Sequence, residues 1–162
     1  MNFTIRKGEK KDMSSVLGLI NELAIFEREP DAVNITVDDL LENGFKEKPE
    51  FNVLVAENEG DIVGMALFYN RFSTWDGPSL HLEDLIVAEE YRGKGVGKAL
   101  YNKVLEFGLT SGKKRIEWVV LDWNTPAIDF YKSTGATMYE EWNICQIWEK
   151  DIKNYLLKNK RL

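Results

Sequence analysis

Apolar and polar positions recur along the chain with two periods, which divide it into strand-like and helix-like segments. Residues 3 to 6 alternate as in a short strand, and a helix capped by Asp12 follows and ends near Pro30. The apolar residues of this helix have helical spacing: Met13, Val16, Leu17, Ile20 and Ala24. A short second helix is predicted from Thr36 to about Asn43, with Gly44 as its stop.

Strand-like segments dominate the middle of the chain. Residues 51 to 57 and 62 to 70 are predicted strands, and residues 58 to 61, with the sequence Asn-Glu-Gly-Asp, suit a hairpin turn between them. His81 to Val87 is the next predicted strand, followed by a glycine-rich loop and a helix that ends near Gly112. This order indicates a strand–loop–helix unit.

The last third of the chain contains both kinds of segment. Residues 115 to 121 read as a strand buried on both faces, which predicts a strand parallel to its predecessor through a right-handed crossover. A helix begins at Thr125-Pro126 and ends at Gly135, residues 137 to 148 are strand-like, and a last helix spans about residues 152 to 158. We therefore predict an α/β (α+β) chain with a mixed, twisted sheet of six or seven strands, flanked by four or five helices.

Composition restricts the class of protein. At 162 residues without an evident linker or repeat, residues 1 to 162 are predicted to form a single domain. The net charge of −6 argues against a nucleic-acid partner and is compatible with a cationic small molecule. Cys145 is the only cysteine, so we expect no internal disulfide and no metal site, and place this residue in the core. Without a signal-like or membrane-spanning run, we expect no membrane partner and a cytoplasmic protein.

The loop from Tyr91 to Lys98 carries the strongest chemical signal. Its three glycines at alternate positions, between a strand and a helix, allow the backbone to approach a phosphate closely. A P-loop has four residues between its first glycine and the Gly-Lys-Ser/Thr, whereas only three separate Gly93 from Gly97. A Rossmann fingerprint has its third glycine one position later than Gly97. A glycine-rich turn with solvated lysines is the alternative that the loop alone leaves open.

The pattern Arg-x-x-Gly-x-Gly from Arg92 to Gly97 resembles motif A of the GNAT superfamily of N-acetyltransferases, where this loop holds the pyrophosphate of acetyl-CoA. Residues 123 to 136 resemble motif B of the same superfamily. The chain resembles one branch over nearly its whole length, the spermidine/spermine N-acetyltransferases and their thialysine-acetylating relatives. That likeness also rests on residues 22 to 27, 82 to 87 and 155 to 158.

This resemblance implies the GNAT fold, acetyl-CoA as co-substrate and a homodimer. The residues implied in cofactor binding are Leu85, Ile86, Val87, Arg92, Gly93, Lys94, Gly95, Val96, Gly97, Lys98, Asn124, Thr125, Pro126, Ala127 and Tyr131. Those implied on the substrate side are Phe26, Glu27, Trp75, Glu83, Asp84, Glu117 and Trp142. Tyr131 is also implied as the general acid for the departing thiolate, with core packing as its alternative role.

The chemistry of amine acetylation suits these residues. An alkylammonium of pKa ~10.4 costs about 4.6 kcal/mol to deprotonate at pH 7, so a base is needed. Glu83 is the predicted proton acceptor, through water, while Glu27 holds a distal cation. Consecutive strand residues point to opposite faces, so Glu83 and Asp84 can share a cleft only across a β-bulge. His81, the only histidine, has no evident partner set and is treated as structural or as a minor substrate contact.

The sequence therefore predicts an N-acetyltransferase that acts on a small cationic amine by direct transfer in a ternary complex. A polyamine, a diamine and a lysine-like amino acid all remain open as substrates, because residues 139 to 148 match the polyamine branch poorly. Two alternatives are an acetyltransferase for protein amines and a non-catalytic acyl-CoA-binding module.

Overall fold

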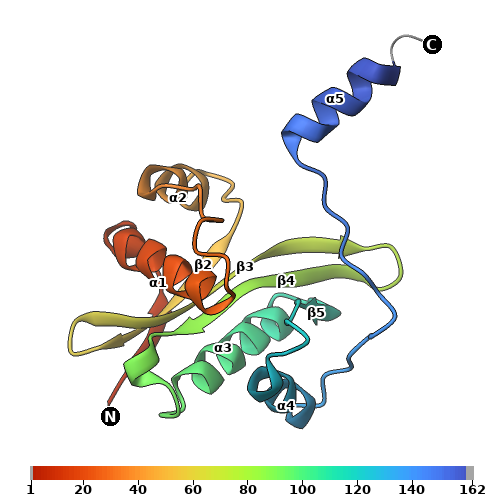
Figure 1. Cartoon of the computed structure of the whole chain (residues 1–162). Helices are drawn as coiled ribbons and strands as arrows, with labels where there is room; N and C mark the ends of the chain where they lie inside the picture. The colour runs from red at the N-terminus through yellow and green to blue at the C-terminus, as the bar shows by residue number, and fades with distance from the viewer. Residues whose placement is uncertain (1, 160–162) are drawn as a thin grey trace. The chain divides into compact units, whose positions relative to one another are not determined.

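The computed structural model describes residues 2 to 159 (Figure 1). Their contacts group them into two compact units, residues up to Leu121 and residues from Asp122 onward, which are described separately. The first unit contains the whole sheet, and the second contains two helices and an extended connection between them.

A mixed sheet of five strands forms the centre of the first unit, in the order β1-β2-β3-β4-β5. The first three pairs of neighbours are antiparallel, and β5 runs parallel to β4, as predicted. The strands are β1 (Thr4–Lys7), β2 (Asn52–Asn58), β3 (Asp61–Ser73), β4 (Gly77–Val87) and β5 (Arg115–Glu117).

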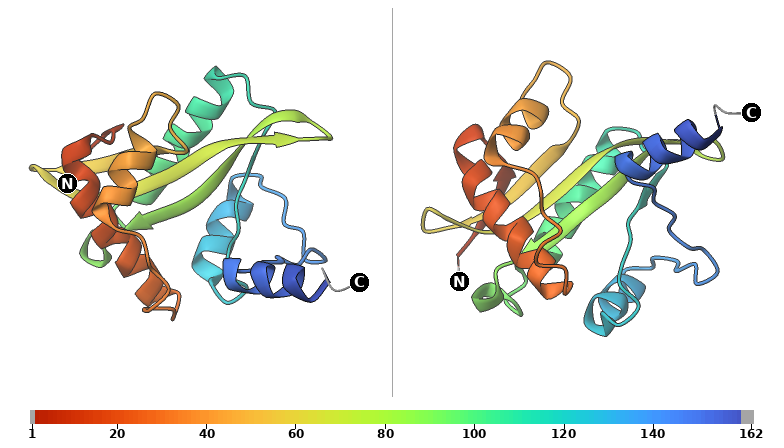
Figure 2. Two further views of the ribbon diagram at one scale, coloured as in Figure 1. Left: turned by 90° about the horizontal axis from the view of Figure 1, so that it is seen from above. Right: turned by 45° about the horizontal axis from the view of Figure 1, so that its top comes forward.

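Helices cover both faces of this sheet (Figures 1 and 2). They are α1 (Met13–Phe26), α2 (Val37–Gly44) and α3 (Val96–Thr110), with short 3-10 turns at Lys10–Asp12 and Glu89–Tyr91. Leu67 of β3 belongs to the core that α1 and α2 cover, whereas the next residue, Phe68, meets Phe107 of α3 with ring centroids 5.0 Å apart. Successive strand residues point to opposite faces, so α3 lies on the face opposite α1 and α2.

Asp12 joins the start of α1 to the sheet. Its carboxylate accepts two hydrogen bonds from the Arg6 guanidinium, at 2.6 and 3.0 Å, and Arg6 also donates to Glu57 of β2 at 2.6 Å. The expected capping of α1 by this side chain is wrong, because Asp12 lies in the preceding 3-10 turn and accepts from the backbone N–H of Glu9. Thr36 does cap α2, through reciprocal bonds with Asp39.

The hairpin between β2 and β3 follows the prediction. Asn58 pairs with Asp61, so Glu59 and Gly60 form a two-residue turn. Both have positive φ, 53° and 96°, as the turn that matches the twist of the strands requires.

The second unit contains α4 (Thr125–Ser133) and α5 (Glu149–Asn159). The five helices α1 to α5 match the predicted four or five, but the sheet has five strands in place of six or seven. Residues 137 to 148 form no strand among the described residues, because alternation of side chains does not supply a backbone partner. Cys145 in this segment is exposed, so its expected place in the core is wrong.

The strand predicted for residues 115 to 121 is also shorter than expected. It ends at Glu117, its three residues are half-buried, and Val119 beyond it is exposed. Burial on both faces was therefore a wrong expectation, whereas the parallel pairing with β4 is confirmed. Among residues 2 to 159, no helix combines the length and apolar character that a membrane span requires.

Candidate active site

The glycine-rich loop connects the 3-10 turn after β4 to α3. Gly93 and Gly95 have φ of 71° and 85°, a left-handed conformation that favours glycine. Gly95 is also the N-cap of α3 and offers no side chain to the helix, so the first backbone N–H groups of α3 face the loop. Such a helix start is suited to binding an anion, which fits the predicted pyrophosphate grip.

Arg92 anchors this loop to the rest of the first unit. Its Nε donates to the carbonyl of Val87 at 2.9 Å, its Nη2 donates to Glu22 of α1 at 3.2 Å, and its guanidinium lies 5.4 Å from the centre of the Phe26 ring. Glu22 also accepts from the backbone N–H of Glu89 at 2.9 Å. The contacts of Arg92 with Phe26 and Glu22 therefore fix the shape of the loop. The sequence did not predict Glu22 as a partner of Arg92.

The two lysines of the loop differ in their contacts. Lys94 donates to the carbonyl of Glu90 at 2.8 Å, and its ammonium lies 5.1 Å from the centre of the Tyr91 ring. Lys98 is exposed in the first turn of α3. Both add positive charge near the start of the helix.

One edge of β4 has no strand beside it where cofactor contacts were predicted. Leu85, Ile86 and Val87 pair with β3 on one side. On the other side β5 pairs only with Ser79 to His81, so within the described residues the backbone of residues 85 to 87 has no strand neighbour on that edge. An extended amide-containing chain such as pantetheine can pair with such an edge.

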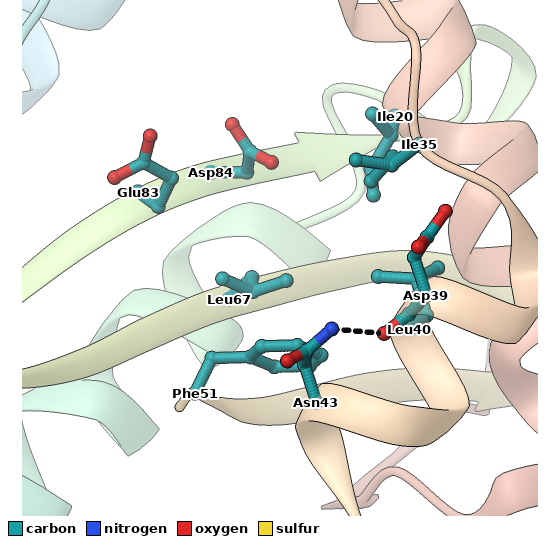
Figure 3. A pocket seen from close by; sticks show the side chains of 9 residues that line it. All are labelled: Ile20, Ile35, Asp39, Leu40, Asn43, Phe51, Leu67, Glu83 and Asp84. Atoms are coloured by element: carbon teal, nitrogen blue, oxygen red, sulfur yellow. Dashed lines mark hydrogen bonds between the residues drawn. The ribbon is translucent and has the colours of Figure 1, made fainter. Parts of the chain in front are cut away.

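A β-bulge in β4 brings two carboxylates to the same face. Leu82 pairs with Phe68 and Asp84 pairs with Leu67, so Glu83 is an extra residue between two regular pairs. Glu83 and Asp84 consequently line the same hollow, and their side chains project together from β4 (Figure 3). From the sequence, Glu83 and Asp84 could share a cleft only across a β-bulge, and that bulge is present.

The hollow lies between the sheet and the two N-terminal helices and is largely apolar apart from these acids (Figure 3). Its lining residues are Ile20, Ile35, Asp39, Leu40, Asn43, Phe51, Leu67, Glu83 and Asp84. Asn43 and Asp39 belong to α2, where the Asn43 amide donates to the Asp39 carbonyl at 2.9 Å. An apolar wall beside a pair of acids suits an alkyl chain that carries an ammonium group.

Burial and like charge raise the proton affinity of this site. Burial raises the pKa of Asp84 to about 6, with smaller contributions from the negative charges of Glu83 and Glu27. Burial also raises the pKa of Glu27, which follows the last residue of α1. Asp84 is therefore a better proton acceptor near neutral pH than an ordinary aspartate.

Glu117 lies in a network of charges on β5. It forms salt bridges with Arg71 of β3 and with Arg115, the latter at 2.8 Å, and Arg115 also binds Asp76 at 2.7 Å. His81 lies between Glu117 and Glu83. The sequence offered His81 no partners for a metal site or a catalytic triad, and the strand arrangement places two acids beside it, of which Glu117 is distant in the sequence.

Trp75 lies apart from the hollow. It occupies the turn between β3 and β4 and is 80% exposed. Glu83 is six residues beyond Gly77, the first residue of β4, a distance of roughly 20 Å along a strand. The first unit thus brings Glu83, Asp84 and the charge of Glu27 together without Trp75.

The remaining predicted residues belong to the second unit. Asn124 is the N-cap of α4, and its side-chain oxygen accepts from the N–H of Ala127 at 3.4 Å, while Pro126 occupies the first turn. Tyr131 is half-buried on this helix beside Phe130, with ring centroids 5.3 Å apart. Thr125 begins α4, and Trp142 is exposed in the segment that follows. Their places at the site remain predictions.

Groups of His, Cys, Asp and Glu suited to holding a metal ion are absent from residues 2 to 159. The hollow itself presents the carboxylates of Glu83 and Asp84. These groups can bind and deprotonate a cationic amine.

Residues 19–136 match the family model described as the Acetyltransferase (GNAT) family. The chain belongs to this family. It is an acetyl-CoA-dependent N-acetyltransferase, which confirms the predicted enzyme class and fold. The match extends across the boundary between the two compact units at residues 121 and 122.

Two similar proteins support the same family. The chain is 40% identical over 150 residues to the thialysine N-epsilon-acetyltransferase of Bos taurus, covering 86% of this chain and 88% of that protein. It is 34% identical over 152 residues to the human spermidine/spermine N(1)-acetyltransferase-like protein 1, covering 88% of this chain and 22% of that protein. The predicted branch of the family is therefore confirmed.

Solved structures share the fold at lower identity. An integron cassette protein from V. cholerae has a TM-score of 0.77 and 23% identity, with 96% of this GNAT chain and 98% of that chain covered. An aminoglycoside acetyltransferase from a soil metagenomic sample has a TM-score of 0.75 and 22% identity, with 90% and 95% covered. At this level of identity the likeness concerns the fold.

Proposed function

We propose that the protein transfers the acetyl group of acetyl-CoA directly to a primary amine of a small cationic substrate, such as a polyamine, a diamine or a lysine-like amino acid. The observation that carries this proposal is the placement of Glu83 and Asp84 beside one apolar hollow by the bulge in β4. The apolar wall suits methylene groups, and the two carboxylates suit an ammonium. The names of the thialysine- and spermidine/spermine-acetylating relatives point to the same substrate class.

Acetyl-CoA would supply the activated acetyl group as a thioester. The loop from Arg92 to Lys98 would hold its pyrophosphate, because positive φ at Gly93 and Gly95 leaves the first N–H groups of α3 facing the loop. Residues 85 to 87 would pair with pantetheine along the β4 edge, and residues 124 to 127 would complete the cofactor cleft. The orientation of the thioester would then follow from backbone contacts.

Glu83 would take the first proton from the amine, through water. Asp84, with its pKa raised to about 6, would hold the same ammonium and act as the second acceptor of the pair. Glu27 would bind a distal cation, which separates substrate binding from deprotonation and suits a substrate with two amines. Phe26, Glu117 and Trp142 would contribute to the substrate side, whereas Trp75 lies apart from the hollow.

Tyr131 would protonate the departing thiolate. A phenol of ordinary pKa ~10 can transfer a proton to a thiolate whose thiol has pKa ~8.5, at a cost of only about 2 kcal/mol. Asn124 would contact pantetheine with its amide N–H groups, because its oxygen already caps α4.

The proposal also includes a homodimer, a single domain in each chain and a cytoplasmic location. The segment from Tyr139 to Leu157 exposes many large apolar side chains, which a second copy would cover. These residues are Tyr139, Trp142, Ile144, Ile147, Trp148, Ile152, Tyr155, Leu156 and Leu157. A family match that crosses from the first unit into the second supports the single domain, and the net charge of −6 supports a partner other than nucleic acid or membrane.

The test is acetyl transfer to a panel of monoamines, diamines, lysine analogues and a lysine-containing peptide. We expect turnover of the small diamines or lysine analogues, with Glu83→Gln and Tyr131→Phe at least about 100-fold slower and acetyl-CoA affinity within about twofold. Glu106→Gln, on the exposed side of α3, is the control for a lost carboxylate. Preference for the peptide would support a protein acetyltransferase, and acetyl-CoA binding without turnover of any amine would support a binding module.

A further inference from the structure

His81 of β4 lies between two acids on one face of the sheet. It pairs with Tyr69 of β3 on one side and with Glu117 of β5 on the other, so these three side chains share a face. Its Nε2 is 3.6 Å from Glu83 Oε2, and its Nδ1 is 3.9 Å from Glu117 Oε1. One nitrogen of the imidazole thus lies beside the proposed proton acceptor and the other beside a second carboxylate.

The imidazole is held rigidly and largely away from solvent. Its side chain is only 14% exposed, and the Tyr69 ring stacks on it with centroids 5.2 Å apart and planes 28° apart. Burial and the neighbouring Glu83 carboxylate raise the pKa of the Tyr69 phenol, so Tyr69 lies beside both members of the pair. Within the described residues Nδ1 of His81 is buried without a hydrogen-bond partner, an arrangement that is unusual for a purely structural histidine.

Charged and polar groups from three neighbouring strands surround His81. From β3 it faces Tyr69 and Arg71, from β4 Glu83, and from β5 Arg115 and Glu117. Both arginines bind Glu117, and Arg115 also binds Asp76, so the guanidinium groups are engaged on the β5 side. No arginine or lysine contact with Glu83 occurs among the described ion pairs, which leaves His81 as its cationic neighbour when protonated.

We propose that His81 is a positioning residue for Glu83 and takes over the proton that Glu83 removes from the substrate amine. This inference rests on the proposed acetyl transfer. An N–H bond of the ammonium breaks as its proton passes to a bridging water and the water gives a proton to Glu83, and that proton then passes from Glu83 Oε2 to His81 Nε2. The Glu83 carboxylate is restored, and the imidazolium lies between Glu83 and Glu117.

The proton balance of the reaction requires such an outlet. An ammonium that becomes an amide loses two protons, and the departing thiolate takes up one of them, so one proton is released in each turnover. Transfer of the first proton from Glu83 to His81, whose Nε2 lies 3.6 Å from Glu83 Oε2, supplies that outlet. Glu83 is then anionic again when the second proton leaves the nitrogen.

Kinetics against pH test the proposal. In His81→Gln we expect kcat to fall about tenfold or more with KM for acetyl-CoA within about twofold, and the acidic limb of kcat/KM to differ from that of the wild-type protein. Added imidazole should restore part of the activity of His81→Ala. Ser79→Ala is the matched control, because Ser79 is buried on the same face of β4 two residues away.

The single histidine of the chain allows a second, direct readout. The imidazole signals in an NMR titration of the untagged protein belong to His81 alone, and in Glu83→Gln we expect their midpoint to move to lower pH by about half a unit or more, because a neighbouring negative charge is lost. Glu106→Gln should leave the midpoint in place.

The outcomes separate the relay from the proposed function. An unchanged pH profile in His81→Gln, or an unchanged NMR midpoint in Glu83→Gln, would overturn the proposed role of His81. The proposed acetyl transfer would still hold in that case if the wild-type protein acetylates an amine. If the wild-type protein acetylated no amine while the midpoint moved, the acetyl-transfer function would be overturned and, with it, the relay, although the contact between His81 and Glu83 would stand.

Discussion

Glu83 and Asp84 are consecutive residues of β4, yet both line the same hollow, because a bulge leaves Glu83 between two regular pairs with β3. Two carboxylates this close cannot both be anionic without mutual repulsion. Burial, together with this repulsion, raises the pKa of the half-buried Asp84 to about 6. The bulge thus determines the protonation of the site as well as its shape.

Replacing Asp84 with asparagine should stabilise the protein at neutral and alkaline pH. A carboxyl group whose pKa is raised from 3.8 to about 6 on folding contributes stability below pH 3.8 that is lost as pH rises through about 6. Asp84→Asn removes the buried charge and should add about 1–3 kcal/mol at pH 8, with a gain that shrinks toward pH 4. Thermal unfolding at both pH values measures this, and a lower Tm at pH 8 would contradict it.

Gly95 should be needed for its backbone conformation, and Gly97 for its open surface. With φ of 85° at Gly95, Gly95→Ala strains the loop by about 1 kcal/mol and should weaken acetyl-CoA binding about tenfold. A Cβ at Gly97 would meet only Val87 Cγ2 at 3.6 Å, an ordinary contact, so Gly97→Ala should leave the Tm within about 2 °C. Calorimetric titration and thermal unfolding separate the two, and equal stability losses would contradict the distinction.

A positive charge in the wall of the hollow should oppose cationic substrates. Ile35 lines the hollow and is 44% exposed, so Ile35→Lys can be accommodated while its ammonium repels the substrate near Glu83 and Asp84. We expect KM for a diamine to rise about tenfold with the KM for acetyl-CoA unchanged. Ile25→Lys is the matched control, because Ile25 is 65% exposed on α1 and does not line the hollow. Equal effects of the two variants would place the amine elsewhere.

The buried Asp12 should be essential to the stability of the first unit. The Arg6 guanidinium holds the pKa of Asp12 below its usual value, so its contribution is present above pH 3.8 and is lost as pH falls through the lowered pKa. Asp12→Asn should cost about 2–4 kcal/mol at pH 7 because Arg6 loses its buried partner. Urea unfolding measures this, with exposed Asp61→Asn expected to change stability by less than about 0.5 kcal/mol.

Local patterns predicted the parts of the molecule whose geometry is itself local. The Glu59–Gly60 turn and the left-handed glycines of the glycine-rich loop follow from residue type and spacing, and both form as expected. The strand expected at residues 137 to 148 did not form, because alternation specifies side-chain faces and leaves the backbone partner unspecified. Residues that act through distant partners, such as Glu22 and Tyr69, carried no local signal.

The sequence by itself determined the family, the glycine-rich loop between β4 and α3, and the identity of the acids. Only the tertiary structure decided that Glu83 and Asp84 face one hollow and that His81 lies between Glu83 and Glu117. The physical reason is that a bulge and a strand register are set by hydrogen bonds between segments far apart in the chain, and a shift of one residue turns every side chain to the other face.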